Sequence, residues 1–232
     1  MPIPIGQNIV GSKWVFKLKR NANGNINRHK AWLVTQGYSQ QPGFDYEELY
    51  SLVVHYDSLR LLIALSAFHH WHPQQLDIKA AFLYGILNKD IYIQLPEGSR
   101  IDGMCRKLTK CIYGLKQSPR EWYHQLIDFL TSYGIVVSNF DPCILMFKSD
   151  NDSHNDTNNA NKVLNNTRYN DTNNVLFIAV YVDDLSLFGP KGLVMDNLKD
   201  LLKSEFKVTD LGDLHWLLGI RIEYRDHDIA LS

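Results

Sequence analysis

The chain has 232 residues, of which 45% are apolar, and its formal net charge is −1. This length and apolar share suit one large domain, or two small ones, with a sizeable core. No apolar run approaches the ~20 residues that a transmembrane helix needs, which excludes such a span and predicts no membrane partner. The near-neutral charge alone predicts no nucleic-acid partner either.

Cysteine usage and the first residues bear on the compartment. Cys105, Cys111 and Cys143 are odd in number and lack a Cys-x-x-Cys spacing, which argues against a disulfide framework and against a zinc site. A reducing, intracellular compartment is therefore expected. The first four residues, Met-Pro-Ile-Pro, show neither the charged start nor the apolar run of a signal peptide.

Basic residues are unevenly distributed along the chain. Residues 1–44 contain six Lys and Arg residues and no acid, and residues 104–120 contain five and no acid. Such segments suit a polyanionic partner. The alternative is an ordinary solvated surface whose acidic residues lie elsewhere in the sequence, and charge alone does not separate the two.

The first half of the chain predicts a hairpin, a helix and two strands. Two strand-like runs flank an Asn-Gly turn signal within residues 11–38. Asp57 or Ser58 could cap a helix that ends near residues 69–72. The segment "QQLDIKAAFLYG" is typical of a strand that ends in a turn, and "IYIQLP" of a short strand.

The second half predicts two helices and a closing hairpin. "SPREWYHQLIDFLTSYG" has a serine cap, a proline in the first turn and a terminal glycine, and its apolar residues share one face. Residues 193–206 fit a second amphipathic helix, and "HWLLGIRIEY" a strand or hairpin. Residues 149–174 are dominated by Asn and Asp, which predicts a disordered insertion.

Two adjacent aspartates, Asp183 and Asp184, interrupt the apolar run "VLFIAVYVDDLSLF". Burying adjacent carboxylates is costly unless positive charge lies between them. Apolar residues on both sides predict two strands joined at or near these residues by a turn, which would let both side chains serve one site. Mg²⁺ takes carboxylates together with phosphates and water, and two such ions can assist phosphoryl transfer.

A third carboxylate is needed from another strand, and Asp77 in "QLDIKAAF" follows an apolar residue at the end of a predicted strand. The alternative interpretation of these three residues is structural. Asp183 and Asp184 would then make a polar turn, and Asp77 would act as a cap.

The motifs together resemble the reverse transcriptase of copia-type (Ty-like) long-terminal-repeat retrotransposons. The resemblance runs in order from about Lys13 to Tyr224, outside the Asn-rich insertion. It is carried by "KWVFKLKRNANGNINRHKAWLV", "GFDYEELYSLVV", "QLDIKAAFLYG", "IYIQLPEG", "LTKCIYGLKQSPREWY", "YVDDLSLFG" and "VTDLGDLHWLLGI". "LYGLKQ" and "YVDD" in this order are specific, although the chain reads "IYGLKQ" at the first of them.

The resemblance implies an α+β fold with the fingers and palm of a right-hand polymerase. The palm would be an antiparallel sheet backed by helices. Residues 1–70, with parts of 85–118, would form the fingers-like region, and 71–232 the palm with the insertion 149–174 inside it. A thumb and a ribonuclease H domain would be absent.

The resemblance also implies the roles of individual residues. The catalytic and metal-binding triad would be Asp77, Asp183 and Asp184. The nucleotide-contacting residues would be Lys30, Ala80, Ala81, Phe82 and Gln117, with Lys30 on the triphosphate and Phe82 as a steric gate against the ribose 2′-OH. Leu218 and Gly219 would lie near the primer end. Lys207 is a candidate proton donor to pyrophosphate, with a surface lysine as its alternative.

The implied activity is that of an RNA-directed DNA polymerase, a nucleotidyltransferase. It would use two Mg²⁺ ions, which Mn²⁺ could replace, an RNA or DNA template–primer and deoxynucleoside triphosphates. Other polyprotein parts or a second subunit could be partners. An intracellular location follows, either cytoplasmic within a virus-like particle or nuclear.

The chain departs from the family pattern at four positions. Trp32 stands where the family has arginine, which removes a bidentate phosphate cation. Leu52, Tyr84 and Thr209 stand where proline, asparagine and lysine are common. A second hypothesis is therefore a truncated, inactive remnant that at most binds nucleic acid. A third is a metal-binding protein that uses His69, His70 and His72.

Overall fold

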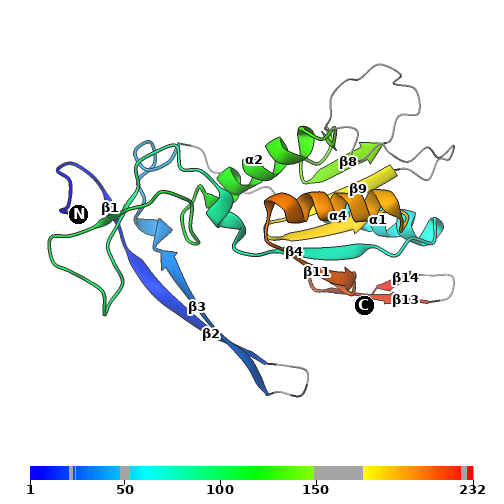
Figure 1. The fold of residues 1–232 in the computed structure, drawn as a ribbon, viewed down its shortest axis with the longest axis horizontal. Helices are drawn as coiled ribbons and strands as arrows, with labels where there is room; N and C mark the ends of the chain where they lie inside the picture. Colours follow the sequence, from blue (N-terminus) through cyan, green and yellow to red (C-terminus); the bar gives the residue numbers. More distant parts are fainter. Residues whose placement is uncertain (21–22, 24, 48–52, 149–174, 226–228, 232) are drawn as a thin grey trace. The chain divides into compact units, whose positions relative to one another are not determined.

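The computed structural model describes residues 1–20, 23, 25–47, 53–148, 175–225 and 229–231. It divides into two compact units. Unit 1 comprises Met1–Ser51 and Ala81–Gln125, and unit 2 comprises Leu52–Ala80 and Leu126–Ser232. Both contain strands and helical segments (Figure 1). The expected mixed class of helices and sheets is confirmed, and the predicted insertion at 149–174 lies outside the described residues.

Unit 1 is built on a long hairpin, as the sequence predicts. Strands β2 (Ser12–Arg20) and β3 (Ile26–Thr35) pair in antiparallel register and form a two-stranded sheet of their own. A second small sheet has the order β1 (Ile9–Val10), β5 (Tyr92–Ile93) and β6 (Arg106–Lys107). Unit 1 also contains two short 3₁₀ helices, η1 (Gly37–Ser39) and η2 (Ala81–Tyr84).

Gly114, in the "GLKQ" motif, occupies a position in unit 1 that requires a glycine. Its φ is 95°, a left-handed conformation that residues with a Cβ rarely adopt. An added Cβ would lie 2.1 Å from the carbonyl oxygen of Thr35. The glycine therefore lets the motif approach the end of β3.

Unit 2 contains a six-stranded antiparallel sheet. Its order is β11-β4-β10-β9-β8-β7. The strand bounds are β4 (Gln74–Ile78), β7 (Val136–Val137), β8 (Ile144–Lys148), β9 (Val175–Tyr181), β10 (Asp184–Phe188) and β11 (Val208–Asp213). The central strands have long apolar runs because side chains on both of their faces are covered.

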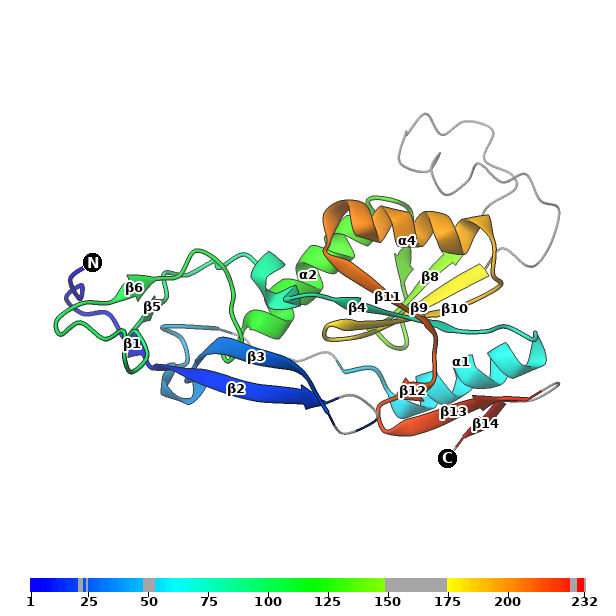
Figure 2. The same cartoon turned by 60° about the horizontal axis from the view of Figure 1, so that its bottom comes forward.

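Helices cover both faces of this sheet (Figure 2). Helix α1 (Tyr56–Phe68) lies on one face and α4 (Leu193–Glu205) on the other. Helix α2 (Ser118–Thr131) begins in unit 1 and ends in unit 2. Within unit 2, Phe129 of α2 meets Phe206 edge to face, with ring centroids 5.2 Å apart.

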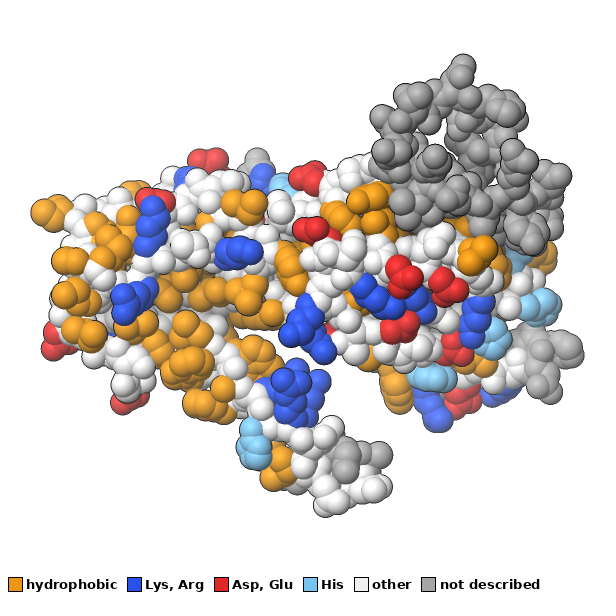
Figure 3. All heavy atoms as spheres, viewed as in Figure 1, with side chains coloured by type: hydrophobic (Ala, Val, Ile, Leu, Met, Phe, Trp, Pro, Cys, Tyr) orange, Lys and Arg blue, Asp and Glu red, His pale blue; other side chains and the backbone are white. Residues whose placement is uncertain are grey.

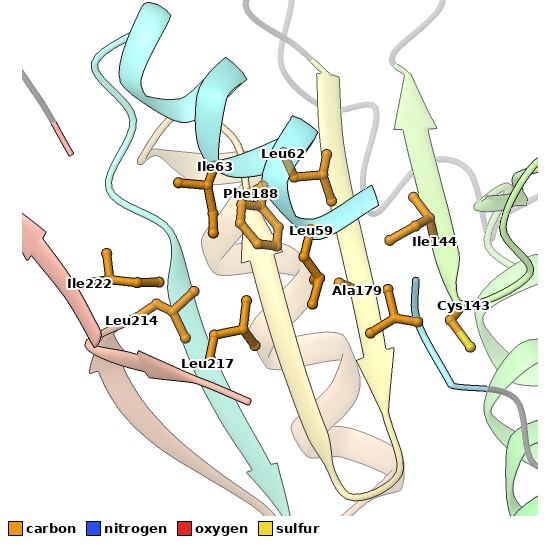
Figure 4. Close-up of a cluster of buried hydrophobic side chains, with 11 residues drawn as sticks. Leu59, Leu62, Ile63, Cys143, Ile144, Ala179, Phe188, Leu214, Leu217 and Ile222 are labelled. Carbon is orange, nitrogen blue, oxygen red and sulfur yellow. The ribbon is translucent and has the colours of Figure 1, made fainter. Parts of the chain in front are cut away.

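The α1 face of the sheet carries a well-defined core (Figure 4). Leu59, Leu62 and Ile63 of α1 pack with Ala179 and Phe188 of the central strands. A C-terminal sheet closes this cluster with its buried leucine and isoleucine side chains. Its strands are β12 (Trp216–Leu217), β13 (Ile220–Tyr224) and β14 (Ile229–Leu231).

The start of α1 differs from the prediction. The helix begins at Tyr56, its N-cap is His55, and no side chain of that N-cap bonds to the helix. The prediction of Asp57 or Ser58 as the cap is therefore wrong by two or three residues. An acid from a distant segment, Asp141, occupies the capping place: it accepts hydrogen bonds from the N–H groups of His55 (2.9 Å) and Cys143 (3.0 Å).

Asp141 is 3% exposed. Burial raises its pKa, but hydrogen bonds from Ser58 and from the N–H groups of His55 and Cys143 outweigh burial and hold the pKa below its ordinary value. A lowered pKa means that the carboxylate stabilises the fold above the pKa of the unfolded chain. That contribution is lost as the pH falls through the folded-state pKa.

We expect Asp141→Ala to lower the free energy of unfolding by about 2–3 kcal/mol at pH 7, because the buried N–H of Cys143 and the partly buried N–H of His55 lose their acceptor. Asp141→Asn keeps one acceptor oxygen and should lose less. Urea unfolding between pH 3 and pH 7 measures both effects. The acid-dependent loss of stability should shrink in both variants, and an unchanged pH profile in Asp141→Asn would contradict the assigned role.

Candidate active site

The adjacent aspartates lie at a tight hairpin turn, as the flanking apolar runs predict. Strand β9 ends at Tyr181, β10 begins at Asp184, and these two residues are direct partners. Val182 and Asp183 are therefore the two turn residues. Val182 has a φ of 55°. Two-residue hairpin turns require a positive φ at the first central residue, but a β-branched side chain there is strained by about 1–3 kcal/mol.

The neighbouring strand brings the third aspartate to the same place. Asp184 is the direct antiparallel partner of Asp77 in β4. Side chains of directly opposed residues lie on the same face of a sheet, with Cβ atoms about 4.5–5.5 Å apart. The backbone locks this register beyond the strand, since the N–H of Ile78 donates to the carbonyl oxygen of Asp183 at 2.8 Å.

The three aspartates are half-buried, and their chemistry fits a divalent cation. Carboxylate oxygens at the end of a strand pair, still reachable by solvent and substrate, are the donor set that Mg²⁺ takes together with phosphates. Among the residues that the structure describes, no group of three or more His, Cys, Asp and Glu side chains is close enough to form a finished metal cage. The backbone thus brings the three aspartates close together, but their carboxylates do not converge on a common position in this structure.

The other edge of β4 is held by β11 and α4. Thr209 of β11 is the direct partner of Asp77, and its buried Oγ1 has no hydrogen-bond partner among the described residues. Lys199 of α4, only 8% exposed, donates to Gln74 of β4 and to Asp210 of β11, the latter at 2.9 Å. These bonds tie α4 to β4, the strand that contains Asp77, and to its neighbour β11.

Lys207, the candidate proton donor, is exposed just before β11. Its carbonyl oxygen accepts from the N–H of Lys79 at 2.9 Å, which places its backbone next to the end of β4. The proton-donor role remains a prediction.

Three further predicted residues of unit 2 lie in left-handed turns. Ala80, with a φ of 56°, follows β4 within two residues. Leu218 and Gly219, with φ values of 49° and 87°, are the two central residues of the β12–β13 hairpin. Strained backbone of this kind, at Val182, Ala80 and Leu218 alike, concentrates at functional sites.

Unit 1 holds the remaining predicted residues. Lys30 lies on β3, and its ammonium is 5.4 Å from the ring centroid of Trp32. Ala81 and Phe82 are buried in η2, and the Phe82 ring packs 4.5 Å from that of Tyr113. The Phe82 ring is therefore fixed in position. The proposed nucleotide contacts of these residues remain predictions.

Gln117 occupies a buried polar network that the sequence did not reveal. Its side-chain oxygen accepts from Gln40 at 2.9 Å, and its side-chain nitrogen donates to the carbonyl oxygen of Asp45 at 3.2 Å. The Asp45 carboxylate in turn accepts from Asn8 at 2.6 Å and from the N–H of Gln41 at 2.7 Å. In this structure the amide of Gln117 thus bonds to protein groups. No local sequence signal joins these distant polar residues.

Two of the three histidines of the third hypothesis, His69 and His72, are engaged in ring contacts. His69 stacks on Trp71, with centroids 4.8 Å apart, and His72 stacks on Tyr224, also at 4.8 Å. Within the described part of the chain they belong to no metal-binding group. The same part of the chain contains no helix both long and apolar enough to cross a membrane.

Comparison with known proteins connects this geometry to a family. A family model described as "Reverse transcriptase (RNA-dependent DNA polymerase)" matches residues 1–151 and 143–232. The Pol polyprotein from transposon RE2 of Arabidopsis thaliana is 35% identical over 235 residues, covering 100% of this chain and 15% of the polyprotein. That from transposon TNT 1-94 of Nicotiana tabacum is 37% identical over 224 residues, 95% of this chain and 15% of the polyprotein.

Two further matches are less similar to this chain. The transposon Ty1-BL Gag-Pol polyprotein of Saccharomyces cerevisiae is 26% identical over 225 residues, 94% of this chain and 11% of that polyprotein. A solved structure, the foamy viral protease-reverse transcriptase in complex with double-stranded DNA, is similar over 90% of this chain and 29% of its own, at 12% identity and a TM-score of 0.38.

The curated relatives are thus much longer than this chain, which spans 11–15% of the length of the three described. The match of the family model extends over the whole chain, and the relatives are transposon polyproteins of the kind that the motifs indicated. The chain belongs to the reverse transcriptase (RNA-dependent DNA polymerase) family, as a domain of the copia-type retrotransposon class.

Proposed function

We propose that this chain is the polymerising core of a retrotransposon reverse transcriptase, which adds deoxynucleotides to a primer along an RNA or DNA template. The observation that carries the proposal is the direct pairing of Asp77 with Asp184, next to Asp183 in the hairpin turn. Family membership supports the reaction class. The fingers would comprise residues 1–70 with parts of 85–118, and the palm residues 71–232. The two compact units divide the chain at other places, with Leu52–Ala80 in unit 2 and Ala81–Gln125 in unit 1.

Asp77, Asp183 and Asp184 would hold two Mg²⁺ ions, with Mn²⁺ as a substitute. The ions supply neutralisation of phosphate charge and activation of the primer hydroxyl. The chain's own contribution is positional. The strained turn at Val182 and the hydrogen bond from the Ile78 N–H to the Asp183 carbonyl oxygen would hold the backbone that carries the carboxylates. Preorganised groups of this kind avoid reorganisation during the reaction.

The remaining residues would bind and select the nucleotide. Lys30 would place its ammonium on the triphosphate, and the N–H groups of Ala80 and Ala81 would approach the same phosphates because their side chains are small. Phe82, whose ring is held by Tyr113, would be the wall that rejects a ribose 2′-OH. Gln117 would act near the nucleotide or template, and Leu218 with Gly219 near the primer end.

The partners and the compartment follow from the same proposal. Template–primer and deoxynucleoside triphosphates would be the substrates. Other parts of a polyprotein, or a second subunit, would complete the grip on the nucleic acid. The protein would act inside the cell, either in the cytoplasm within a virus-like particle or in the nucleus.

A second candidate function is nucleic-acid binding without polymerisation. It is favoured by Trp32, which stands where the family has a phosphate-binding arginine. Losing one such cation could cost a few kcal/mol of transition-state stabilisation, or roughly two orders of magnitude in rate.

Primer extension on an RNA template separates the two. The purified chain is given a DNA primer, deoxynucleotides and Mg²⁺ or Mn²⁺, beside an Asp183→Asn variant. The proposed function predicts extension by the wild-type chain that the variant lacks. No extension by either protein, with equal binding of template–primer by both, would contradict polymerisation and support the binding function.

A further inference from the structure

The β2–β3 hairpin has two chemically different faces. Its register pairs Lys17 with Lys30 and Lys19 with Arg28. Because successive residues of a strand point to opposite faces, these two pairs lie on one face, together with Lys13 and Trp32. The other face carries Trp14, Phe16 and Leu18, which are 45%, 75% and 47% exposed.

The cationic face is unusual because like charges are directly opposed in two successive pairs on it. Directly opposed like charges destabilise a sheet. Residues 1–44 contain no acid at all. Within the described part of the chain, Lys13, Lys17, Lys19 and Arg28 form no ion pair. In Figure 3, Lys and Arg side chains gather on this hairpin near its tip.

Trp32 adds an aromatic surface to the same face. It is the direct partner of Val15, lies two residues from Lys30 on β3, and is half-buried, with the Lys30 ammonium 5.4 Å from its ring centroid. Cations that follow a backbone, beside a ring on which a base can stack, are the combination that binds single-stranded nucleic acid. A duplex offers the phosphates but keeps its base faces stacked inside.

We propose that the cationic face of the β2–β3 hairpin binds the phosphate backbone of a single nucleic-acid strand, and that Trp32 stacks on one of its unpaired bases. This inference rests on the proposed function in one respect: the polymerase function identifies the bound strand as the unpaired part of the template. It extends the role of this hairpin beyond the triphosphate contact of Lys30. It also gives Trp32 a function of its own: a stacking surface in place of a phosphate cation.

The test is the binding of a fluorescently labelled 12-nucleotide oligo(dT), with no primer present, measured by anisotropy. Stacking of one base is worth about 1–3 kcal/mol, so Trp32→Ala should weaken binding by about 5- to 150-fold. Trp14→Ala is the matched control, because it removes the same side chain from the opposite face of the same hairpin. It should change the affinity less than twofold. Circular dichroism checks that both variants keep their strands.

Salt dependence tests the phosphate contacts. Each lost contact should lower the slope of log K against log salt by about 0.7, as expected for single strands. We expect this change for Lys19→Gln and for Arg28→Gln. Lys203→Gln, which removes an exposed charge from α4, should leave the slope unchanged.

The proposal would be overturned by equal losses in Trp32→Ala and Trp14→Ala, by a slope unchanged by Lys19→Gln and Arg28→Gln, or by tighter binding of a 12-base-pair duplex than of the single strand. Full displacement of the oligonucleotide by a deoxynucleoside triphosphate would also overturn it, because the face would then be a nucleotide site. A chain that binds the strand but does not extend a primer would contradict the proposed function and leave this inference intact.

Discussion

Asp184→Asn is expected to lower the rate of RNA-templated primer extension by at least about a thousandfold, while the chain remains folded. Asp184 pairs directly with Asp77 and continues the turn that holds Asp183. A metal-binding carboxylate acts on charge that develops in the transition state. Losing one such electrostatic contact typically costs about 10²–10³ in rate, and losing a metal ligand removes further activation.

Asp184→Asn should not lower the stability of the chain, although it should lower its activity. In the absence of metal, the substitution removes one of three neighbouring negative charges, so the free energy of unfolding should be unchanged or slightly higher. With Mg²⁺, the wild-type chain should gain stability according to RT ln(1 + [Mg²⁺]/Kd), and the variant should gain less. Thermal unfolding with and without Mg²⁺ measures this.

Asp200→Asn is the matched control, because Asp200 is an exposed acid of α4 in the same unit. It should leave both extension and the Mg²⁺-linked gain unchanged. If Asp184→Asn unfolded the chain, the lost activity would reflect folding, and the assigned role would not stand.

Leu126→Asp is expected to unfold the protein. Leu126 is 0% exposed and lies on α2, in the part of that helix which belongs to unit 2. Placing a carboxylate there combines the loss of a buried leucine with the burial of an unpaired charge. Together these exceed about 4 kcal/mol, a large share of the 5–15 kcal/mol that stabilises a typical domain.

Leu61→Asp makes the same substitution on α1 at a side chain that is 60% exposed. It should change the free energy of unfolding by no more than about 0.5–1 kcal/mol. Chemical denaturation followed by circular dichroism compares the two. A soluble Leu126→Asp variant that unfolds cooperatively, as stable as Leu61→Asp, would refute the assigned packing of α2.

Local patterns predicted much of the fold because they are carried by neighbouring residues. The turn at Asp183 follows from apolar runs on both of its sides, and α2 from its serine, proline and glycine signals. The β2–β3 hairpin follows from an Asn-Gly turn signal between two strand-like runs. In each case the information lies within one continuous segment of the sequence.

Features that depend on distant residues were not predictable in this way. The cap of α1 comes from Asp141, more than 80 residues away, so the local acid and hydroxyl at Asp57 and Ser58 were misleading. The direct pairing of Asp77 with Asp184 requires knowing which strands are neighbours and in which register. Gln117 was assigned from its motif, whereas its bonds to Gln40 and Asp45 appear only in the folded chain.

The most direct test of the account is the binding of Mn²⁺, counted by electron paramagnetic resonance on the wild-type chain and on Asp77→Asn, with template–primer and a non-hydrolysable deoxynucleotide present. If Asp77, Asp183 and Asp184 form one metal site, the wild-type chain should bind two ions. Asp77→Asn should weaken at least one of them by about tenfold or more, while Asp200→Asn should bind as the wild-type chain does. Equal binding by the wild-type chain and Asp77→Asn would contradict the account, because the strand register that brings the aspartates together would then build no metal site.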